Sequence, residues 1–377
     1  MNRNPFITNG YAGAEYFCDR VNETETIVRL LTNQNNVALI SPRRMGKTDL
    51  IRHCLNQPEI KDDYYTFEVD IYSTGSLNDF INMLGKAVLE TLRTKGRAVW
   101  DGFLKVLSSV RSEISFDING NPVWGLGIGN IVNPEITLSE IFTYLQNADK
   151  PCIVAIDEFQ QILKYPDGEK VEAALRTHIQ RCSNANFIFS GSHRHLMSGM
   201  FVTPSRPFYQ SVTIINLHAI EQAKYLEFCK DKFLVAGKQL EDSVVDVIYK
   251  RFNSTTMYLQ KVMNILFSLT PEGAMCTVEM IDTAVDTLLN LASDAYETIL
   301  NQMPEKQRNL FLAISAEGQA TSISGGQFVR KYRLISSSSV LSAAKGLLDK
   351  DFITQDKGVY STYDLFFVEW LRMKKMI

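Results

Sequence analysis

The residues best suited to chemistry form a short polar loop between an apolar run and a helical pattern. The run Val37–Ile40 is typical of a buried parallel strand, and the apolar spacing from Asp49 onward predicts a helix. The loop consists of Ser41, Pro42, Arg43, Arg44, Met45, Gly46, Lys47 and Thr48. Its spacing is that of a phosphate-binding P-loop in which serine replaces the first glycine.

The residue types in this loop match the chemistry of a nucleoside triphosphate. Backbone N–H groups and the start of the following helix make a partly positive cradle for phosphate oxygens. Lys47 can reach the β- and γ-phosphates, and the Thr48 hydroxyl can ligate Mg²⁺. We therefore predict that residues 41–49, Asp49 included, bind ATP and magnesium. The alternative is a chance Gly-Lys-Thr in a surface turn, and Ser41 weakens the motif because glycine there supplies a conformation that side chains resist.

A second polar pair follows the apolar run Pro151–Ile156. Asp157 and Glu158 come at its end, where a buried central strand would face magnesium-bound phosphate. Asp157 is predicted to hold the metal. Glu158 is predicted to orient and deprotonate the water that attacks the γ-phosphate, a task that depends on positioning. An apolar strand that ends in Asp-Glu by chance is the alternative.

A third apolar run, Asn186–Phe189, leads into serines. Because parallel strands share one rim at their carboxyl ends, Ser190 or Ser192 is predicted to lie beside the γ-phosphate and the attacking water. A serine turn that merely ends a strand is the alternative. Arg206 follows in a turn, where it is either a phosphate contact from the same or a neighbouring subunit or a plain surface arginine.

The elements that position these residues predict an α/β core with a parallel sheet flanked by helices over residues 1–218. Strands are expected at 64–71 and 211–217. Residues 96–134 are rich in glycine and are predicted to form an irregular insertion with a hairpin built from 114–118 and 124–128. The aromatic residues of the N-terminal arm, such as Phe6, either cover the nucleotide base or pin the arm to the core.

Two smaller parts follow the core. Four helical patterns predict a helical lid over 219–293, and three helices with a hairpin predict a winged helix over 294–377. A winged helix can place its third helix in the major groove of DNA. Nine basic and five acidic residues between Gly325 and Ile377 give that part a net charge of about +4. The third helix itself carries only Lys345, so packing or a protein partner is the alternative.

The composition is that of a globular protein and adds few constraints. The 377 residues carry a formal net charge of -3, so attraction to nucleic acid or an anionic membrane requires a local patch. The six cysteines lack Cys-x-x-Cys spacing and are predicted to be reduced core thiols. The sequence shows neither a signal peptide nor a long apolar run, so we expect a cytoplasmic protein without a membrane partner.

In this order, the motifs resemble the archaeal-type ATPase family of the AAA+ and STAND group. The resemblance covers nearly the whole chain, with Walker A in the P-loop, Walker B around Asp157 and a sensor strand at Ser190. The segments that carry it are Asn4–Phe6, Phe17–Arg20 with Glu25, Pro42–Thr48, Ile156–Gln160, Ser190–Ser192 with Met197, and Arg206–Tyr209. It implies ATP binding with slow or regulated hydrolysis that changes the position of the lid and the winged helix.

Three positions depart from the pattern of that family. Ser41 replaces a glycine, Asn253–Leu259 stands where many relatives have Gly-Gly-x-Pro, and Asp364-Leu365 stands where many have Asp-Pro. Whether Ser41 and Met257 weaken nucleotide binding stays open.

We therefore predict an Mg-ATP-dependent ATPase that acts as a switch or motor, through a protein partner or self-association. A nucleotide-regulated protein that binds duplex DNA and an ATP-loaded scaffold with little turnover are the alternatives.

Overall fold

The computed structural model describes residues 4–109, 114–117, 120, 122–124 and 131–377. The chain forms two compact units. One unit is Asn9–Tyr225, and the other combines the described residues before Asn9 with Leu226–Ile377. The predicted domain bounds at 218 and 293 stay predictions.

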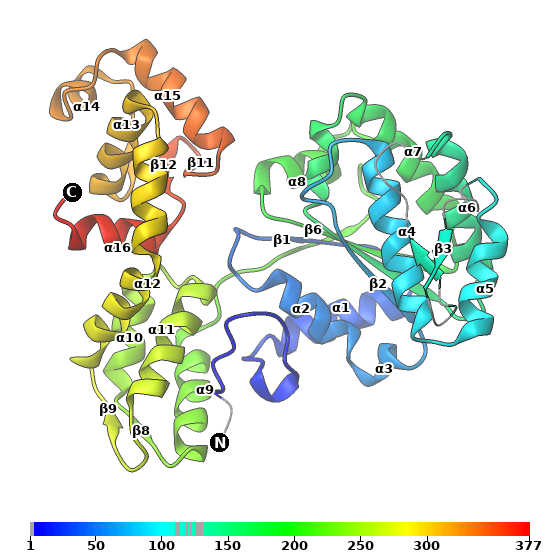
Figure 1. Cartoon of the computed structure of the whole chain (residues 1–377), viewed down its shortest axis with the longest axis horizontal. Coiled ribbons are helices and arrows are strands. Elements are labelled where there is room, and N and C mark those ends of the chain that lie inside the picture. Colours follow the sequence, from blue (N-terminus) through cyan, green and yellow to red (C-terminus); the bar gives the residue numbers. More distant parts are fainter. Residues whose placement is uncertain (1–3, 110–113, 118–119, 121, 125–130) are drawn as a thin grey trace. The chain divides into compact units, whose positions relative to one another are not determined.

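The first unit is built on a five-stranded sheet whose pairings are all parallel (Figure 1). The strands, in spatial order, are β2 (Tyr65–Asp70), β5 (Cys152–Asp157), β6 (Ala185–Gly191), β1 (Val37–Ile40) and β7 (Thr213–Asn216). All residues of β1 and β6 are buried, as expected of central strands covered on both faces. The predicted parallel sheet is confirmed.

Helices cover both faces of this sheet. Leu39 and Ile153 belong to a core cluster with α1, α2 and α3, whereas Val154 and Phe187 belong to a larger cluster with the later helices. Among the described residues, the α-helices and 3₁₀ segments of this unit are η1 (Ala14–Tyr16), α1 (Val21–Thr32), α2 (Lys47–Leu55), α3 (Pro58–Lys61), α4 (Leu77–Arg93), α5 (Arg97–Val106), α6 (Pro134–Asn147), η3 (Phe159–Lys164), α7 (Gly168–Arg181) and α8 (Arg194–Val202).

The insertion after α4 is more regular than the sequence predicted. Helix α5 occupies part of it, because Trp100 and Phe103 supply a buried face despite the flanking glycines. A hairpin is present, but its second strand lies earlier than predicted: β3 (Ile114–Phe116) pairs antiparallel with β4 (Pro122–Trp124), and of the predicted strands 118 and 125–128 lie outside the described residues. Trp124 packs on Gly85, where a Cβ would overlap the indole, and donates to Asn82 Oδ1 at 2.6 Å.

The second unit begins with helices, as predicted for 219–293. They are α9 (Gln222–Val235), α10 (Asp242–Arg251), α11 (Thr256–Leu269) and α12 (Met280–Gln302), with β8 (Gln239–Leu240) paired to β9 (Met275–Cys276). Phe6 of the arm is fully buried among Phe228, Phe233 and Phe267. Phe6 therefore pins the arm to these helices and is not available to stack on a base.

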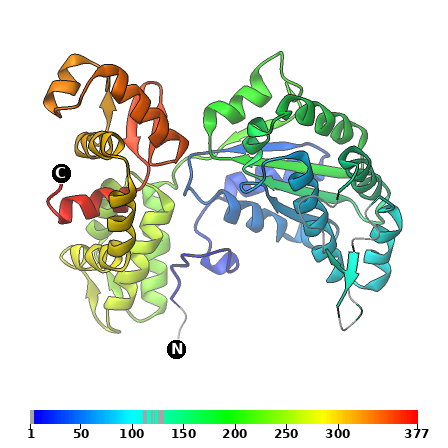
Figure 2. The same ribbon diagram turned by 45° about the horizontal axis from the view of Figure 1, so that its top comes forward.

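A winged helix follows, and this prediction is confirmed. Its helices pack with a small sheet whose strand order is β10-β12-β11, and Figure 2 shows this part of the chain in orange and red. Its elements are α13 (Glu305–Glu317), β10 (Ala320–Thr321), α14 (Gly326–Lys331), α15 (Ser337–Asp349), β11 (Ile353–Asp356), β12 (Val359–Thr362) and α16 (Leu365–Met373). Helix α16 was not predicted from the sequence, and its N-cap Asp364 accepts hydrogen bonds from Phe366 N and Phe367 N.

Helix α16 is tied to the helices before the winged helix. Arg251 of α10 donates from Nη2 to Glu369 Oε2 at 2.6 Å and from Nη1 to Asp282 Oδ1 of α12 at 2.7 Å. The Arg251–Glu369 pair is largely buried, because Glu369 is only 8% exposed, whereas Asp282 is at the surface. We call these three residues the α16 clamp. Beside it, Leu365 N donates to Tyr258 Oη at 2.9 Å, a bond that a proline at this position could not make.

The turn between α10 and α11 has a backbone conformation that suits glycine, although Asn253 and Ser254 stand there. Asn253 and Ser254 adopt φ of 48° and 53°, which is the left-handed region where glycine is easiest to accommodate. A Gly-Gly pair would therefore suit this turn.

All six cysteines are buried and none is in a disulfide, as predicted, and burial raises the pKa of Cys54 and Cys152 to about 12. Within the described ranges, none of the helices has the length and apolar character needed to span a membrane.

Candidate functional site

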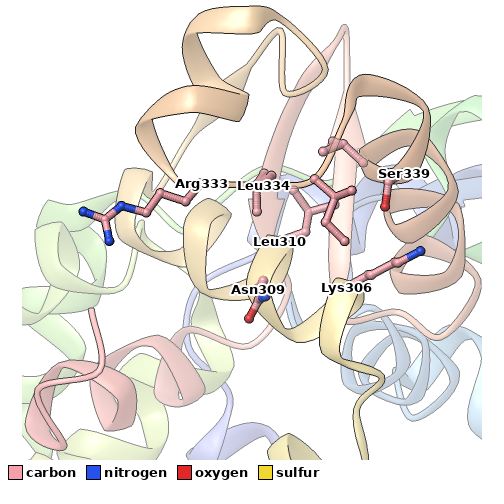
Figure 3. Close-up of a pocket in the computed structure, with 8 residues that line it drawn as sticks. Lys306, Asn309, Leu310, Arg333, Leu334 and Ser339 are labelled. Carbon is pink, nitrogen blue, oxygen red and sulfur yellow. The ribbon is translucent and has the colours of Figure 1, made fainter.

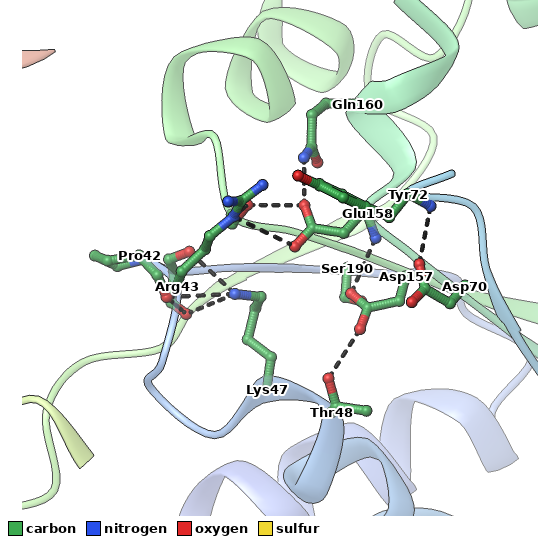
Figure 4. A network of polar contacts seen from close by, with 12 residues as sticks. Pro42, Arg43, Lys47, Thr48, Asp70, Tyr72, Asp157, Glu158, Gln160 and Ser190 are labelled. Atoms are coloured by element: carbon green, nitrogen blue, oxygen red, sulfur yellow. Dashed lines mark hydrogen bonds and ion pairs between the residues drawn. The ribbon is translucent and has the colours of Figure 1, made fainter. Parts of the chain in front are cut away.

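The strand order brings three polar strand ends to one edge of the sheet. Strand β6 lies between β1 and β5, and Ile40, the last residue of β1, pairs with Gly191. The loop after β1, the Asp-Glu pair after β5 and the serines of β6 therefore meet at the carboxyl edge, where open α/β sheets bind ligands (Figure 4).

The loop from Ser41 to Gly46 has the backbone of an anion cradle. Arg44 and Gly46 adopt φ of 67° and 85°, and α2 starts directly afterwards at Lys47. Gly46 is needed because its conformation favours glycine. Ser41 is fully buried and is not among the residues of positive φ, and its hydroxyl donates to Pro42 O at 2.9 Å. Serine therefore fits the first position without strain.

Lys47 points into the loop that precedes it. Its Nζ lies 3.3 Å from Ser41 O and 3.3 Å from Pro42 O, and the residue is 7% exposed. Burial lowers the pKa of Lys47; the carboxylates of Asp157 and Glu158 oppose this shift, and the charge of Arg43 adds to it. A buried ammonium held by neutral carbonyls favours the entry of an anion.

Asp157 joins the P-loop to β6. Thr48 Oγ1 donates to Asp157 Oδ2 at 2.8 Å, and Ser190 Oγ donates to Asp157 Oδ1. A hydroxyl and a carboxylate at this distance are the oxygen ligands that Mg²⁺ prefers. Asp49, one position further along α2, has a carboxyl pKa raised by burial and lowered in part by Arg52.

Glu158 lies beside this pair in a network of its own. It adopts φ of 55°, a left-handed conformation that costs free energy in a residue other than glycine. Ser192 Oγ donates to Glu158 Oε2 at 2.7 Å, Gln160 Nε2 donates to the same oxygen, and Arg43 Nε lies 3.9 Å from Oε1 (Figure 4). Both predicted sensor serines are therefore at the site: Ser190 donates to Asp157, and Ser192 donates to Glu158.

The residues fit an Mg-nucleotide. The cradle, the buried Lys47 ammonium and the Thr48–Asp157 oxygens lie together, as phosphate and magnesium require. The structure brings the predicted catalytic, phosphate-binding and metal-binding residues to one place. Their individual roles stay predictions.

Arg206 is paired away from the carboxylates Asp157 and Glu158. Its guanidinium contacts Glu169 and the fully buried Glu172 of α7. Burial raises the pKa of the Glu172 carboxyl, and Arg206 opposes that shift. Arg206 therefore has a structural partner in its own unit.

Three residues near the site were not predicted to have a role. Gln160 contacts Glu158, Asp70 pairs with Asp157 across β2 and β5, and the ring of Tyr72 lies 5.2 Å from the Arg43 guanidinium. Asp70 could have been found, because it ends a predicted strand as Asp157 does. Gln160 lies in the segment that resembles Walker B, but no role was predicted for it, and nothing in the sequence pattern distinguishes Tyr72 from an ordinary surface residue.

Gly191, the last residue of β6, is closely packed against Gln160 and Met197. A Cβ there would overlap Gln160 Oε1 and would lie 2.5 Å from Met197 Sδ. We expect Gly191→Ala to lower the free energy of unfolding by about 1–3 kcal/mol, because the neighbours must move. Gly199→Ala is the matched control, since no atom lies within 4 Å of its Cβ position. Equal denaturation midpoints for Gly191→Ala and the unchanged protein would contradict the packing argument.

A family model described as an ATPase domain predominantly from Archaea matches residues 17–262, and a model of a probable winged helix domain matches residues 294–373. An uncharacterised ATP-binding protein of Methanocaldococcus jannaschii is 28% identical over 156 residues, which are 39% of this chain and 43% of that protein. The match thus spans less than half the length of this curated relative.

Two solved structures share the fold at low identity. A Walker-type ATPase of Pyrococcus abyssi has a TM-score of 0.65 at 16% identity, with 98% of this chain and 99% of that chain covered. The ORC1 protein of Aeropyrum pernix, solved in complex with DNA, has a TM-score of 0.55 at 11% identity, with 96% and 95% covered. At these identities the likeness concerns the fold alone.

Proposed function

Because the chain belongs to the family of ATPase domains found predominantly in Archaea, we propose that it binds Mg-ATP at the P-loop and hydrolyses it to ADP and phosphate. The observation that carries this proposal is the meeting of Lys47, Thr48 and Asp157 at one edge of the sheet. These three residues supply a cation for phosphate and two oxygens for magnesium.

Each residue would contribute through position and charge. The loop amides and Lys47 would bind phosphate oxygens, and Thr48 and Asp157 would hold Mg²⁺, which neutralises charge on the phosphates when bound. Glu158 would accept the proton of the attacking water. Ser190 and Ser192 would orient the two carboxylates, since each hydroxyl donates to one of them.

Hydrolysis would serve to change the position of the second unit, as in a nucleotide-driven switch. The order of a P-loop core, a helical segment and a winged helix supports this use. The nucleotide would favour one arrangement by binding it more tightly than the other.

Contact with duplex DNA through the winged helix is a second candidate function. It is favoured by the net positive charge of residues 325–377 and by the likeness to a protein solved with DNA. The exposed face of α15 supports a protein partner instead, because Leu341 is 53% exposed and the preceding Ile335 is 72% exposed. Figure 3 shows a pocket at this end of the winged helix, lined by Lys306, Asn309, Leu310, Arg333, Leu334, Ile335, Ser339 and Val340.

One set of measurements tests both functions. Calorimetry with Mg-ATP should show binding, and phosphate release should be measured with and without duplex DNA, alongside size-exclusion chromatography. No heat from well-folded protein would refute the nucleotide proposal. DNA binding that weakens with salt and is lost in Lys345→Glu with Lys350→Glu would favour the DNA function, whereas unchanged binding in that variant would exclude this surface.

A further inference from the structure

The P-loop carries a second cation that reaches the predicted catalytic carboxylate. Arg43 Nε donates to Ser192 Oγ at 3.2 Å and lies 3.9 Å from Glu158 Oε1. The side chains of Arg43 and Glu158 are only 20% and 16% exposed. Arg43 therefore links the loop that would bind phosphate to the residue that would activate water.

The surroundings hold Arg43 in this direction. Its guanidinium carbon lies 5.2 Å from the centroid of the Tyr72 ring, within the range of a cation–π contact. Ser192 in turn donates to Glu158, so Arg43, Ser192 and Glu158 form one connected network (Figure 4). In this arrangement Glu158 accepts from Ser192 and Gln160, and those bonds occupy Oε2.

We propose that Arg43 binds the terminal phosphate of a nucleoside triphosphate, and that its move from Ser192 to phosphate withdraws its charge from Glu158 Oε1, so that Glu158 can accept a proton from water. The proposal deepens the function proposed above and rests on it. Arg43 would be an arginine supplied by the chain's own P-loop. Glu158 would therefore be released by a triphosphate and not by a diphosphate.

Charge and geometry favour this transfer. A phosphate carries more charge than a serine hydroxyl, and the guanidinium presents a fork of donors that matches phosphate oxygens. Arg43 and Lys47 are like charges on one short loop and therefore repel each other. A terminal phosphate between them would relieve that repulsion. Arg206 is held by Glu172 of the same unit, so Arg43 is the better-placed arginine.

The test compares binding of a non-hydrolysable ATP analogue with binding of ADP, both with Mg²⁺. In Arg43→Gln we expect affinity for the analogue to fall about 10- to 100-fold, because a charge-assisted contact is lost, while affinity for ADP changes by less than about twofold. Single-turnover hydrolysis should fall by at least about tenfold at saturating ATP. Arg43→Lys should restore part of the affinity but little of the rate, since it keeps the charge and loses the fork.

Arg181→Gln is the control, because it removes an arginine from the exposed end of α7, outside the network. Equal losses of analogue and ADP affinity in Arg43→Gln would mean that Arg43 only shapes the loop, and faster hydrolysis would mean that it only restrains Glu158. Either result overturns the proposal.

If Lys47→Ala abolishes binding while Arg43→Gln behaves like the unchanged protein, only this inference fails. If the unchanged protein binds no nucleotide, the proposed function fails.

Discussion

Replacing Lys47 with alanine is expected to raise the dissociation constant for Mg-ATP by at least about 100-fold. The loss is large because a buried ammonium that faces a charged phosphate contributes several kcal/mol of binding energy, about 1.4 kcal/mol for each tenfold. Lys47 is 7% exposed and its Nζ lies 3.3 Å from the loop oxygens of Ser41 and Pro42. The other basic residues of α2 lie in its last turn, so they cannot take its place at the loop. Isothermal titration calorimetry measures the change directly.

The fold should survive this substitution. Burial already lowers the pKa of Lys47, which means that the protein surroundings disfavour its charge, and alanine is the best helix former. Thermal unfolding followed by circular dichroism is therefore the control and should show no loss of stability. A folded Lys47→Ala protein that binds Mg-ATP as tightly as the unchanged protein would refute the phosphate-binding role of this loop.

Glu158→Gln is expected to keep nucleotide binding and to lower the turnover rate by about 10²–10⁴-fold. Glutamine has the shape of glutamate and its amide oxygen can still accept from Ser192 Oγ, but it cannot take a proton from water. Asp157 and Thr48 are untouched, so the magnesium oxygens remain in place. Phosphate release at saturating ATP gives the rate, and calorimetry gives the affinity.

The neighbouring serines supply the comparison. Ser192→Ala removes the bond to Glu158 and leaves the carboxylate itself, so its turnover should fall less than that of Glu158→Gln. Equal ATPase rates in Glu158→Gln and the unchanged protein would remove Glu158 from the mechanism. The catalytic base would then have to be sought among the other carboxylates at the sheet edge, beginning with Asp70.

Much of the fold was predictable because strong local patterns agree with tertiary burial. The runs of β1, β5 and β6 are continuously apolar, and the structure buries them on both faces. Helix α5 was missed because the glycines around it mask an apolar face that only packing reveals. Helix α16 was missed because it is apolar on most sides, which obscures the helical period until neighbours cover it.

The site was predictable to the extent that its residues end strands or follow motif spacing. The meeting of Thr48 with Asp157 follows from the rule that parallel strands share one rim, once β6 is placed between β1 and β5. The contacts of Gln160 and Tyr72 depend on side-chain directions, which spacing does not encode. The pairing of Arg206 with Glu172 joins segments 34 residues apart, and no local pattern signals it.

The α16 clamp limits how a nucleotide signal can travel. Arg251, Asp282 and Glu369 join α10, α12 and α16, and α12 continues without a break up to the winged helix. Helices that are joined in this way, without a hinge between them, transmit a displacement from one end to the other. The second unit would thus move as one rigid body. A DNA or protein partner bound to the winged helix would then be displaced whenever α10 and α12 change their orientation.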